Sequence, residues 1–144
     1  MKIIDIQNQL VKEFEELESW EDKYTKIIKL GRELPQMSEE LKTEKNKIEG
    51  CQSQVWMHAE LKDGKMIIVA DSDAMIVKGL IALLVKVYSG HEPGEIMSSP
   101  PEFLQKIGID RHLSPTRKNG LGAMLKQIQL YAVTFNALAA ASEQ

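Results

Sequence analysis

Apolar residues recur at intervals of three and four near the start of the chain, which is the spacing of one face of an amphipathic helix. The first such stripe spans residues 3–17 and consists of Ile3, Ile6, Leu10, Phe14 and Leu17. A second stripe follows over residues 20–34. Ser19 with Asp22 resembles a capping box at its start, and Pro35 marks its end. The pattern therefore predicts two consecutive helices.

The pattern changes to extended structure after residue 54. Residues 55–59, apolar except for His58, and the apolar residues 66–69 flank the segment Lys62-Asp63-Gly64-Lys65. Asp63-Gly64 suits the positive φ angles of a tight hairpin turn. These features predict an antiparallel hairpin.

A third helix is predicted from about Ala74 to Ser89, with Gly90 as its stop. Asp71 and Asp73 precede it, and we expect them to act as caps and as negative charges at the positive end of the helix. The alternative left open is that one of them fixes the loop that carries Cys51.

Short helical turns are expected after Pro93 and after Pro100-Pro101, and a long final helix is expected to begin near Asn119 or Gly120. The sequence thus predicts an α+β fold in which a small antiparallel sheet of about three strands packs against helices from both ends of the chain. With no linker in the pattern, residues 1–144 are expected to form one domain.

Composition and charge argue against several classes of function. The formal net charge is −3, and the fifteen lysines and three arginines are scattered along the sequence, which does not favour nucleic-acid binding. The longest aliphatic run, Leu80 to Val85, is far shorter than the roughly 20 residues that span a membrane. No export signal is visible, so we expect a cytoplasmic protein. The mixed-charge run of residues 39–49 is expected to be a solvated loop and a docking surface.

Cys51 is the only cysteine. It can form no internal disulfide, and alone it cannot supply the thiolates of a zinc or cluster site, so no metal and no cofactor are expected. Cys51 is either a small buried residue or a reactive thiol. Gly50 before it and the polar Gln52, Ser53 and Gln54 after it favour the reactive interpretation.

A cysteine hydrolase would need a histidine near Cys51, and the candidates are His58, His91 and His112, of which His112 is the best placed. The seven residues that follow Cys51 contain no glycine, lysine or arginine, so the loop has no anion cradle of its own. This thiol is better suited to receiving sulfur than to activating it.

Three segments resemble signature stretches of the SufE/CsdE family of sulfur-acceptor proteins: Gly50–Trp56, Asp71–Ala82 and Leu113–Leu121. The resemblance implies an α+β fold similar to that of iron–sulfur scaffold proteins. It also implies that Cys51 attacks the persulfide of a pyridoxal-phosphate cysteine desulfurase of the SufS or CsdA type, becomes a persulfide and stimulates that enzyme. The sulfur would then pass to a scaffold for iron–sulfur cluster assembly.

The remaining candidate site residues are Gly50, Gln52, Asp71, Asp73 and Arg117, which are expected to contact the partner or to support the Cys51 loop. Arg117 is expected to pair with one of the aspartates or with a carboxylate of the desulfurase. An alternative function is a docking regulator of a desulfurase, with Cys51 structural. A homodimer is left open.

Overall fold

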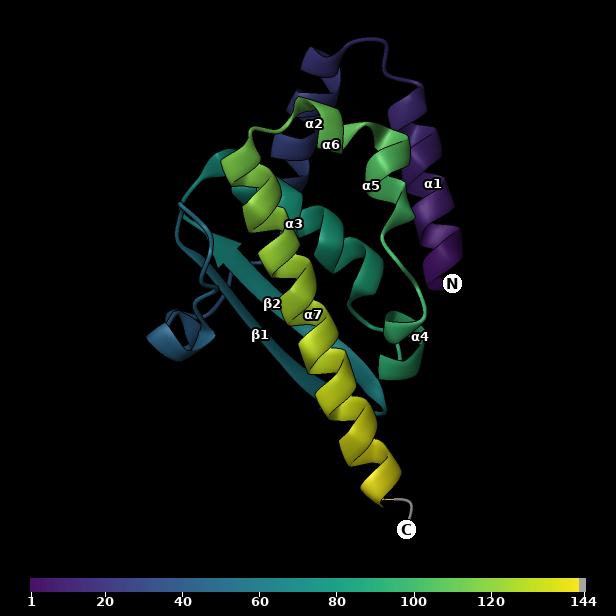
Figure 1. The fold of residues 1–144 in the computed structure, drawn as a ribbon, viewed down its shortest axis with the longest axis vertical. Helices are drawn as coiled ribbons and strands as arrows, with labels where there is room; N and C mark the ends of the chain where they lie inside the picture. Colours follow the sequence, from purple (N-terminus) through teal and green to yellow (C-terminus); the bar gives the residue numbers. More distant parts are fainter. Residues whose placement is uncertain (143–144) are drawn as a thin grey trace.

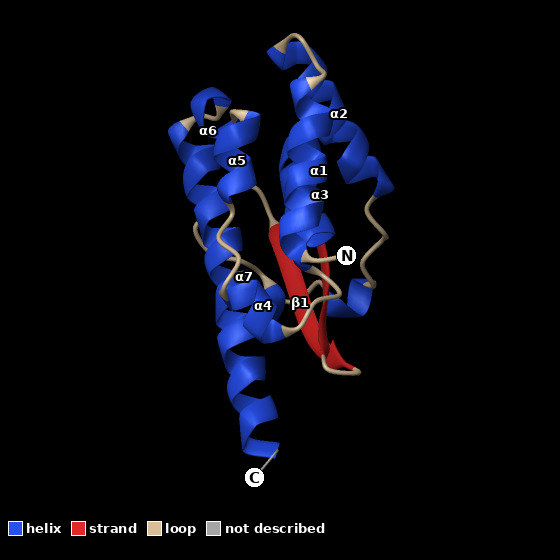
Figure 2. Cartoon of the chain, turned by 90° about the vertical axis from the view of Figure 1, so that its right-hand side faces the viewer, coloured by secondary structure: helices blue, strands red, loops and turns tan. Residues whose placement is uncertain are grey.

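The computed structural model describes residues 1–142, in which helices surround one long β-hairpin (Figure 1). The elements in chain order are α1 (Ile3–Glu15), α2 (Trp20–Glu33), the 3₁₀ turns η1 (Glu39–Leu41) and η2 (Glu44–Asn46), β1 (Val55–Lys62), β2 (Lys65–Ser72), α3 (Met75–Tyr88), α4 (Pro93–Met97), α5 (Glu102–Ile107), α6 (Ile109–His112) and α7 (Pro115–Ser142). Helix α7 is long, and its C-terminal part extends beyond the hairpin in both views (Figures 1 and 2). The α+β class predicted from the sequence is confirmed.

The hairpin has the predicted turn but fewer strands than expected. Strands β1 and β2 pair antiparallel from Val55 opposite Ser72 to Lys62 opposite Lys65, and the turn residues Asp63 and Gly64 have φ of 53° and 79°. The expectation of about three strands is wrong, since the described sheet has two. At each edge of the hairpin, an isolated β-bridge forms where a third strand would pair. The mixed-charge segment before β1 has no apolar alternation to support a longer ladder.

Helices α2 and α3 cross at a pair of glycines. A Cβ atom built on Gly79 would overlap the backbone of Ile27, and one built on Gly31 would lie 2.8 Å from the nitrogen of Gly79. A glycine inside an apolar helix costs about 1 kcal/mol relative to alanine, and this close crossing explains why it is present. From the sequence, Gly79 predicts the close approach of a strand or loop, and this is wrong, because the neighbour is helix α2.

The start of α3 differs from the prediction. Asp71 pairs with Trp56 within the hairpin, so β2 continues to Ser72, and the N-cap residue of α3 is Ala74. No side chain caps the helix. The expected role of Asp71 and Asp73 as helix caps is therefore wrong, and both carboxylates are used elsewhere.

Helix α7 begins earlier than Asn119 or Gly120. Pro115 occupies its first turn, and the Ser114 hydroxyl accepts a hydrogen bond from the Arg117 amide at 3.3 Å, as an N-cap residue does. Asn119 and Gly120, where the sequence predicted the start, lie inside the helix. Arg117 consequently sits in the first turn of α7.

The core lies where α3 packs between α2, β2 and α7. Buried side chains from these elements include Ile27, Ile68, Leu80, Leu83, Leu84 and Ile128. Helix α1 adds Ile3, Leu10 and Phe14, each fully buried, as its stripe predicted. Among the described helices, none combines the length and apolar character needed to cross a membrane.

Candidate functional site

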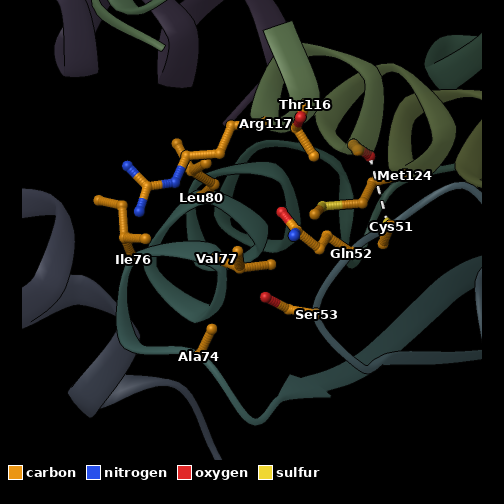
Figure 3. A pocket seen from close by; sticks show the side chains of 11 residues that line it. Cys51, Gln52, Ser53, Ala74, Ile76, Val77, Leu80, Thr116, Arg117 and Met124 are labelled. Atoms are coloured by element: carbon orange, nitrogen blue, oxygen red, sulfur yellow. Dashed lines mark hydrogen bonds between the residues drawn. The ribbon is translucent and has the colours of Figure 1, made fainter. Parts of the chain in front are cut away.

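Cys51 lies in the loop between η2 and β1, where the chain passes alongside the start of α7 (Figure 3). Gly50 precedes it with a φ of 90°, a conformation that glycine adopts at little cost. The Sγ atom is half-buried and donates to the carbonyl oxygen of Gly120 at 3.7 Å. A Cβ atom on Gly120 would touch this sulfur at 3.5 Å. The resting thiol therefore points towards α7.

A cavity of about 120 Å³ adjoins this thiol. Its floor is apolar and comes from α3 and α7, through Ile76, Val77, Leu80 and Met124, together with Ala74. Polar side chains of Gln52, Ser53, Thr116 and Arg117 complete the lining (Figure 3). Burial raises the pKa of the Cys51 thiol above its ordinary value of 9.0. The resting group is thus a protonated thiol near neutral pH.

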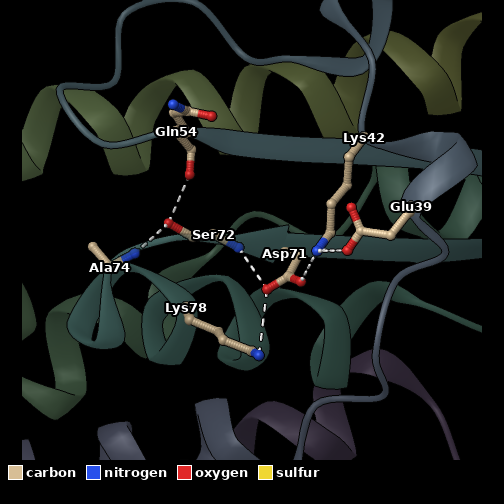
Figure 4. A network of polar contacts seen from close by, with 7 residues as sticks. All are labelled: Glu39, Lys42, Gln54, Asp71, Ser72, Ala74 and Lys78. Carbon is tan, nitrogen blue, oxygen red and sulfur yellow. Dashed lines mark hydrogen bonds and ion pairs between the residues drawn. The ribbon is translucent and has the colours of Figure 1, made fainter.

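The exit of the Cys51 loop is held at Gln54 (Figure 4). The Gln54 amide donates to Oδ1 of Asp73 at 3.0 Å, and its carbonyl oxygen accepts from the Ser72 hydroxyl at 2.8 Å and from the Asp73 amide at 3.3 Å. The Ser72 hydroxyl also accepts from the Ala74 amide at 3.3 Å. Asp73 and Ser72 thus join the loop to the junction between β2 and α3.

Asp71, one residue before Ser72, is buried, and its contacts differ from those of Asp73. Its carboxylate forms ion pairs with Lys42 at 3.1 Å and with Lys78 at 3.3 Å, and it accepts from the Ser72 amide at 2.8 Å (Figure 4). Burial opposes ionisation, but the hydrogen bond from Lys42 and the other contacts outweigh it and lower the pKa of Asp71 below its ordinary 3.8. Asp71 thereby ties η1 to the hairpin and to α3.

Lys42 is a residue of this network that the sequence did not single out. Its ammonium also pairs with Glu39 at 3.0 Å and lies 5.7 Å from the centre of the Trp56 ring. The mixed-charge segment predicted to be a solvated loop is therefore attached to the hairpin through Lys42, and also through the bridge between Lys47 and Trp56 and the hydrogen bond from the Ile48 amide to the Val55 carbonyl oxygen at 2.8 Å. A buried aspartate 29 positions away could not be matched to Lys42 by spacing, because that pairing depends on the tertiary fold.

Arg117 and Gln52 are exposed side chains at the edge of the cavity. The expected pairing of Arg117 with Asp71 or Asp73 is not formed, since within residues 1–142 no acidic side chain makes an ion pair with it. Its guanidinium therefore remains available to a partner. Gln52, next to the thiol, contributes its polar side chain to the same rim.

The three histidines lie apart from Cys51. His112 stacks on Trp20 with ring centres 4.1 Å apart, His91 contacts the carbonyl oxygen of Met1 at 3.0 Å through Nε2, and His58 lies within β1. None of them lines the Cys51 cavity. Over residues 1–142 no cluster of three or more potential metal ligands occurs. The arrangement can present a thiol, but it offers no adjacent histidine to activate one.

Comparison with known proteins shows the family of this chain. A family model for SufE, described as an Fe-S metabolism associated domain, matches residues 8–132. The chain belongs to the SufE family. The family resemblance inferred from the three sequence segments is thereby confirmed.

Individual SufE-like proteins align over most of the chain. A SufE-like protein of Rhizobium meliloti is 39% identical over 127 residues, which cover 85% of this chain and 91% of the relative. A SufE-like protein of Synechocystis is 38% identical, with 88% and 80% covered. SufE-like protein 1 of Arabidopsis thaliana, named as chloroplastic/mitochondrial, is 40% identical, but the aligned part is 34% of its length.

The fold of this SufE-family chain also matches a solved structure. The solution structure of a hypothetical protein from Thermus thermophilus superimposes with a TM-score of 0.77 and covers 92% of this chain and 96% of that one. At 22% identity this match concerns the fold alone.

Proposed function

We propose that this protein is a sulfur acceptor and carrier, which takes a persulfide sulfur from a cysteine desulfurase onto Cys51 and passes it towards iron–sulfur cluster assembly. The observation that carries the proposal is the setting of Cys51. Its thiol sits on a loop with a glycine at one end and hydrogen bonds at the other, beside a small cavity with an apolar floor and a polar rim. Membership of a family described as associated with Fe-S metabolism supports the same conclusion.

The chemistry balances without an added oxidant. The Cys51 sulfur attacks the terminal sulfur of the donor persulfide, so that a new S–S bond forms on Cys51 while the S–S bond of the donor breaks. The donor cysteine leaves as a thiolate and takes up the proton that Cys51 gives up. The product is a persulfide on Cys51, and the donor is returned as a free thiol.

The desulfurase would supply most of the activation. Because burial raises the pKa of Cys51, little thiolate exists at rest, and none of the histidines lines its cavity. The loop would therefore turn outward into the partner, where the partner's groups stabilise the charge that develops on sulfur. The exposed Arg117 at the rim is suited to an orienting contact with a carboxylate of that partner.

Intact mass spectrometry tests the proposal directly. After incubation with a SufS-type cysteine desulfurase and cysteine, the protein should gain the mass of one sulfur, and proteolysis should place it on Cys51. Cys51→Ser should gain none and should lose the stimulation of the desulfurase. A wild-type protein that stimulates the enzyme without gaining sulfur, together with a Cys51→Ser variant that stimulates equally, would instead identify a docking regulator. We also propose that the protein acts in the cytoplasm and that residues 1–144 form a single domain.

A further inference from the structure

The resting Cys51 loop is joined to α7 through the cysteine itself. Its Sγ atom donates to the carbonyl oxygen of Gly120 at 3.7 Å, across 69 positions of sequence (Figure 3). Within residues 1–142, no other hydrogen bond joins residues 50–53 to a helix. The thiol that is proposed to receive sulfur is therefore also the group that holds the front of its own loop in place.

Gly120 leaves its backbone open to this sulfur. It lies in the second turn of α7, where a carbonyl oxygen accepts from the amide four residues further on, so the thiol is a second donor to this oxygen. A Cβ atom at position 120 would lie 3.5 Å from Sγ, and the glycine thus allows the close approach. Departure of the thiol leaves no unpaired acceptor on α7, because the helix still satisfies the carbonyl.

Loading with sulfur removes the donor of this hydrogen bond. In the resting thiol, Sγ is bonded to Cβ and to a hydrogen atom. In the persulfide, Sγ is bonded to Cβ and to the terminal sulfur, and the proton has passed to the donor cysteine. The loaded Sγ then offers only lone pairs to an oxygen that also offers only lone pairs. The contact that holds the empty cysteine is therefore lost when the cysteine is loaded.

The resting position also disfavours a charged sulfur. Cys51 is half-buried, and this burial raises the pKa of its thiol, so the neutral form is favoured there. The apolar floor beside it, from Ile76, Val77 and Leu80, has no side-chain donor for an anion. Arg117 is exposed at the rim, where water screens its charge. A deprotonated persulfide in this position would lose the hydrogen bond and would also be poorly solvated.

We propose that the Gly120 carbonyl makes the Cys51 loop respond to its load, holding the loop closed while Cys51 is a thiol and releasing it once Cys51 is a persulfide. This rests on the proposed function, because the loaded state is the persulfide on Cys51. The empty protein keeps its thiol against α7 until the donor draws it out. The loaded protein exposes its sulfur more of the time, which favours the conformation from which sulfur is handed on.

Nuclear magnetic resonance tests the load response without the desulfurase. The persulfide is made with inorganic polysulfide: the Cys51 thiolate forms an S–S bond to a terminal sulfur, and a polysulfide one sulfur shorter leaves. Intact mass confirms the gain of one sulfur. The carbonyl carbon shift of Gly120 reports the hydrogen bond, and the broadening of the Gln52 and Ser53 amide signals by a neutral gadolinium complex reports exposure of the loop.

Loading should change the Gly120 carbonyl shift and raise the broadening at Gln52 and Ser53 by roughly twofold or more, since a weak hydrogen bond is lost. Two variants separate the hydrogen bond from the added sulfur. Cys51→Ser keeps a donor and should resemble the thiol form, whereas Cys51→Ala has no donor and should resemble the persulfide form in both measurements.

Either of two outcomes would overturn the proposal. A persulfide form whose loop is as exposed as that of the thiol form, or less exposed, would show that loading does not release the loop; lower exposure would place the terminal sulfur in the cavity. Equal loop exposure in Cys51→Ser and Cys51→Ala would show that the hydrogen bond to Gly120 does not hold the loop.

Loading by a SufS-type desulfurase decides the proposed function separately. A protein whose loop opens after treatment with polysulfide, but which gains no sulfur from the desulfurase, would refute the carrier function and leave the load response in place. A protein that gains sulfur from the desulfurase, but whose loop is equally exposed with and without it, would refute the load response alone.

Discussion

Removal of the Asp73 carboxylate should release the exit of the Cys51 loop. Oδ1 of Asp73 accepts the Gln54 amide at 3.0 Å, whereas the bonds to the Gln54 carbonyl come from the Ser72 hydroxyl and from the Asp73 backbone. Asp73→Ala therefore deletes one of three hydrogen bonds and leaves the other two. A hydrogen bond contributes about 1 kcal/mol net, which corresponds to a roughly fivefold change in the equilibrium between closed and open loop.

The rate of Cys51 labelling by a bulky maleimide reports this equilibrium. We expect Asp73→Ala to be labelled about fivefold faster than the wild type, at a rate that low concentrations of urea do not change, because local opening exposes little new surface. Asp73→Asn is the matched control: its amide oxygen can still accept from Gln54, so its labelling rate should lie much closer to that of the wild type.

Two results would refute this reasoning. A folded Asp73→Ala protein labelled at the wild-type rate would show that the carboxylate does not hold the loop. Faster labelling that rises steeply with urea would show that the thiol becomes exposed through global unfolding, and the substitution would then act on overall stability rather than on the loop.

The structure makes two further predictions. Burial raises the pKa of Cys51 above 9.0, so the rate of its alkylation by iodoacetamide should reach half of its maximum above pH 9.0. A midpoint at or below that pH would contradict the burial of the resting thiol. Gly79→Ala should lower the free energy of unfolding in urea by about 1–3 kcal/mol, because α2 leaves no room for a methyl group. The same change at Gly122, which has open space around it, should instead stabilise α7 by up to about 1 kcal/mol, and equal effects at the two sites would refute the close crossing.

Local patterns predicted most of the regular elements. The stripes of α1 and α2, the Ser19 cap and the Asp63-Gly64 turn depend on residues close in sequence, and the structure has all of them. The errors occur at the ends of elements, where a contact with a neighbouring strand or a cap residue decides where the element begins or ends. Pairing with β1 carries β2 through Asp71, and Ser114 with Pro115 starts α7 ahead of Asn119 and Gly120, where the sequence predicted its start.

The surroundings of Cys51 were less predictable than the cysteine itself. Gly50 and the polar residues after Cys51 indicated a loop, but no local pattern indicated that Gly120 would accept a hydrogen bond from the thiol or that Lys42 would pair with Asp71. Those contacts join segments 69 and 29 positions apart, and no local pattern encodes them. The motif thus identified the reactive atom, while its burial depends on the tertiary fold.

The same distinction explains why the sequence showed no cation beside the Cys51 thiol. The loop after Cys51 contains no basic residue, yet α7 places Arg117, an exposed side chain, at the rim of the Cys51 cavity, and Lys45 and Lys126 line a separate hollow between residues 44–49 and α7. The Cys51 thiol instead donates to the carbonyl oxygen of Gly120, so none of these cations holds it at rest. A partner that brings carboxylates to these cations would neutralise them. The charge that develops on sulfur would then depend on groups of the partner, and transfer would be restricted to the docked complex.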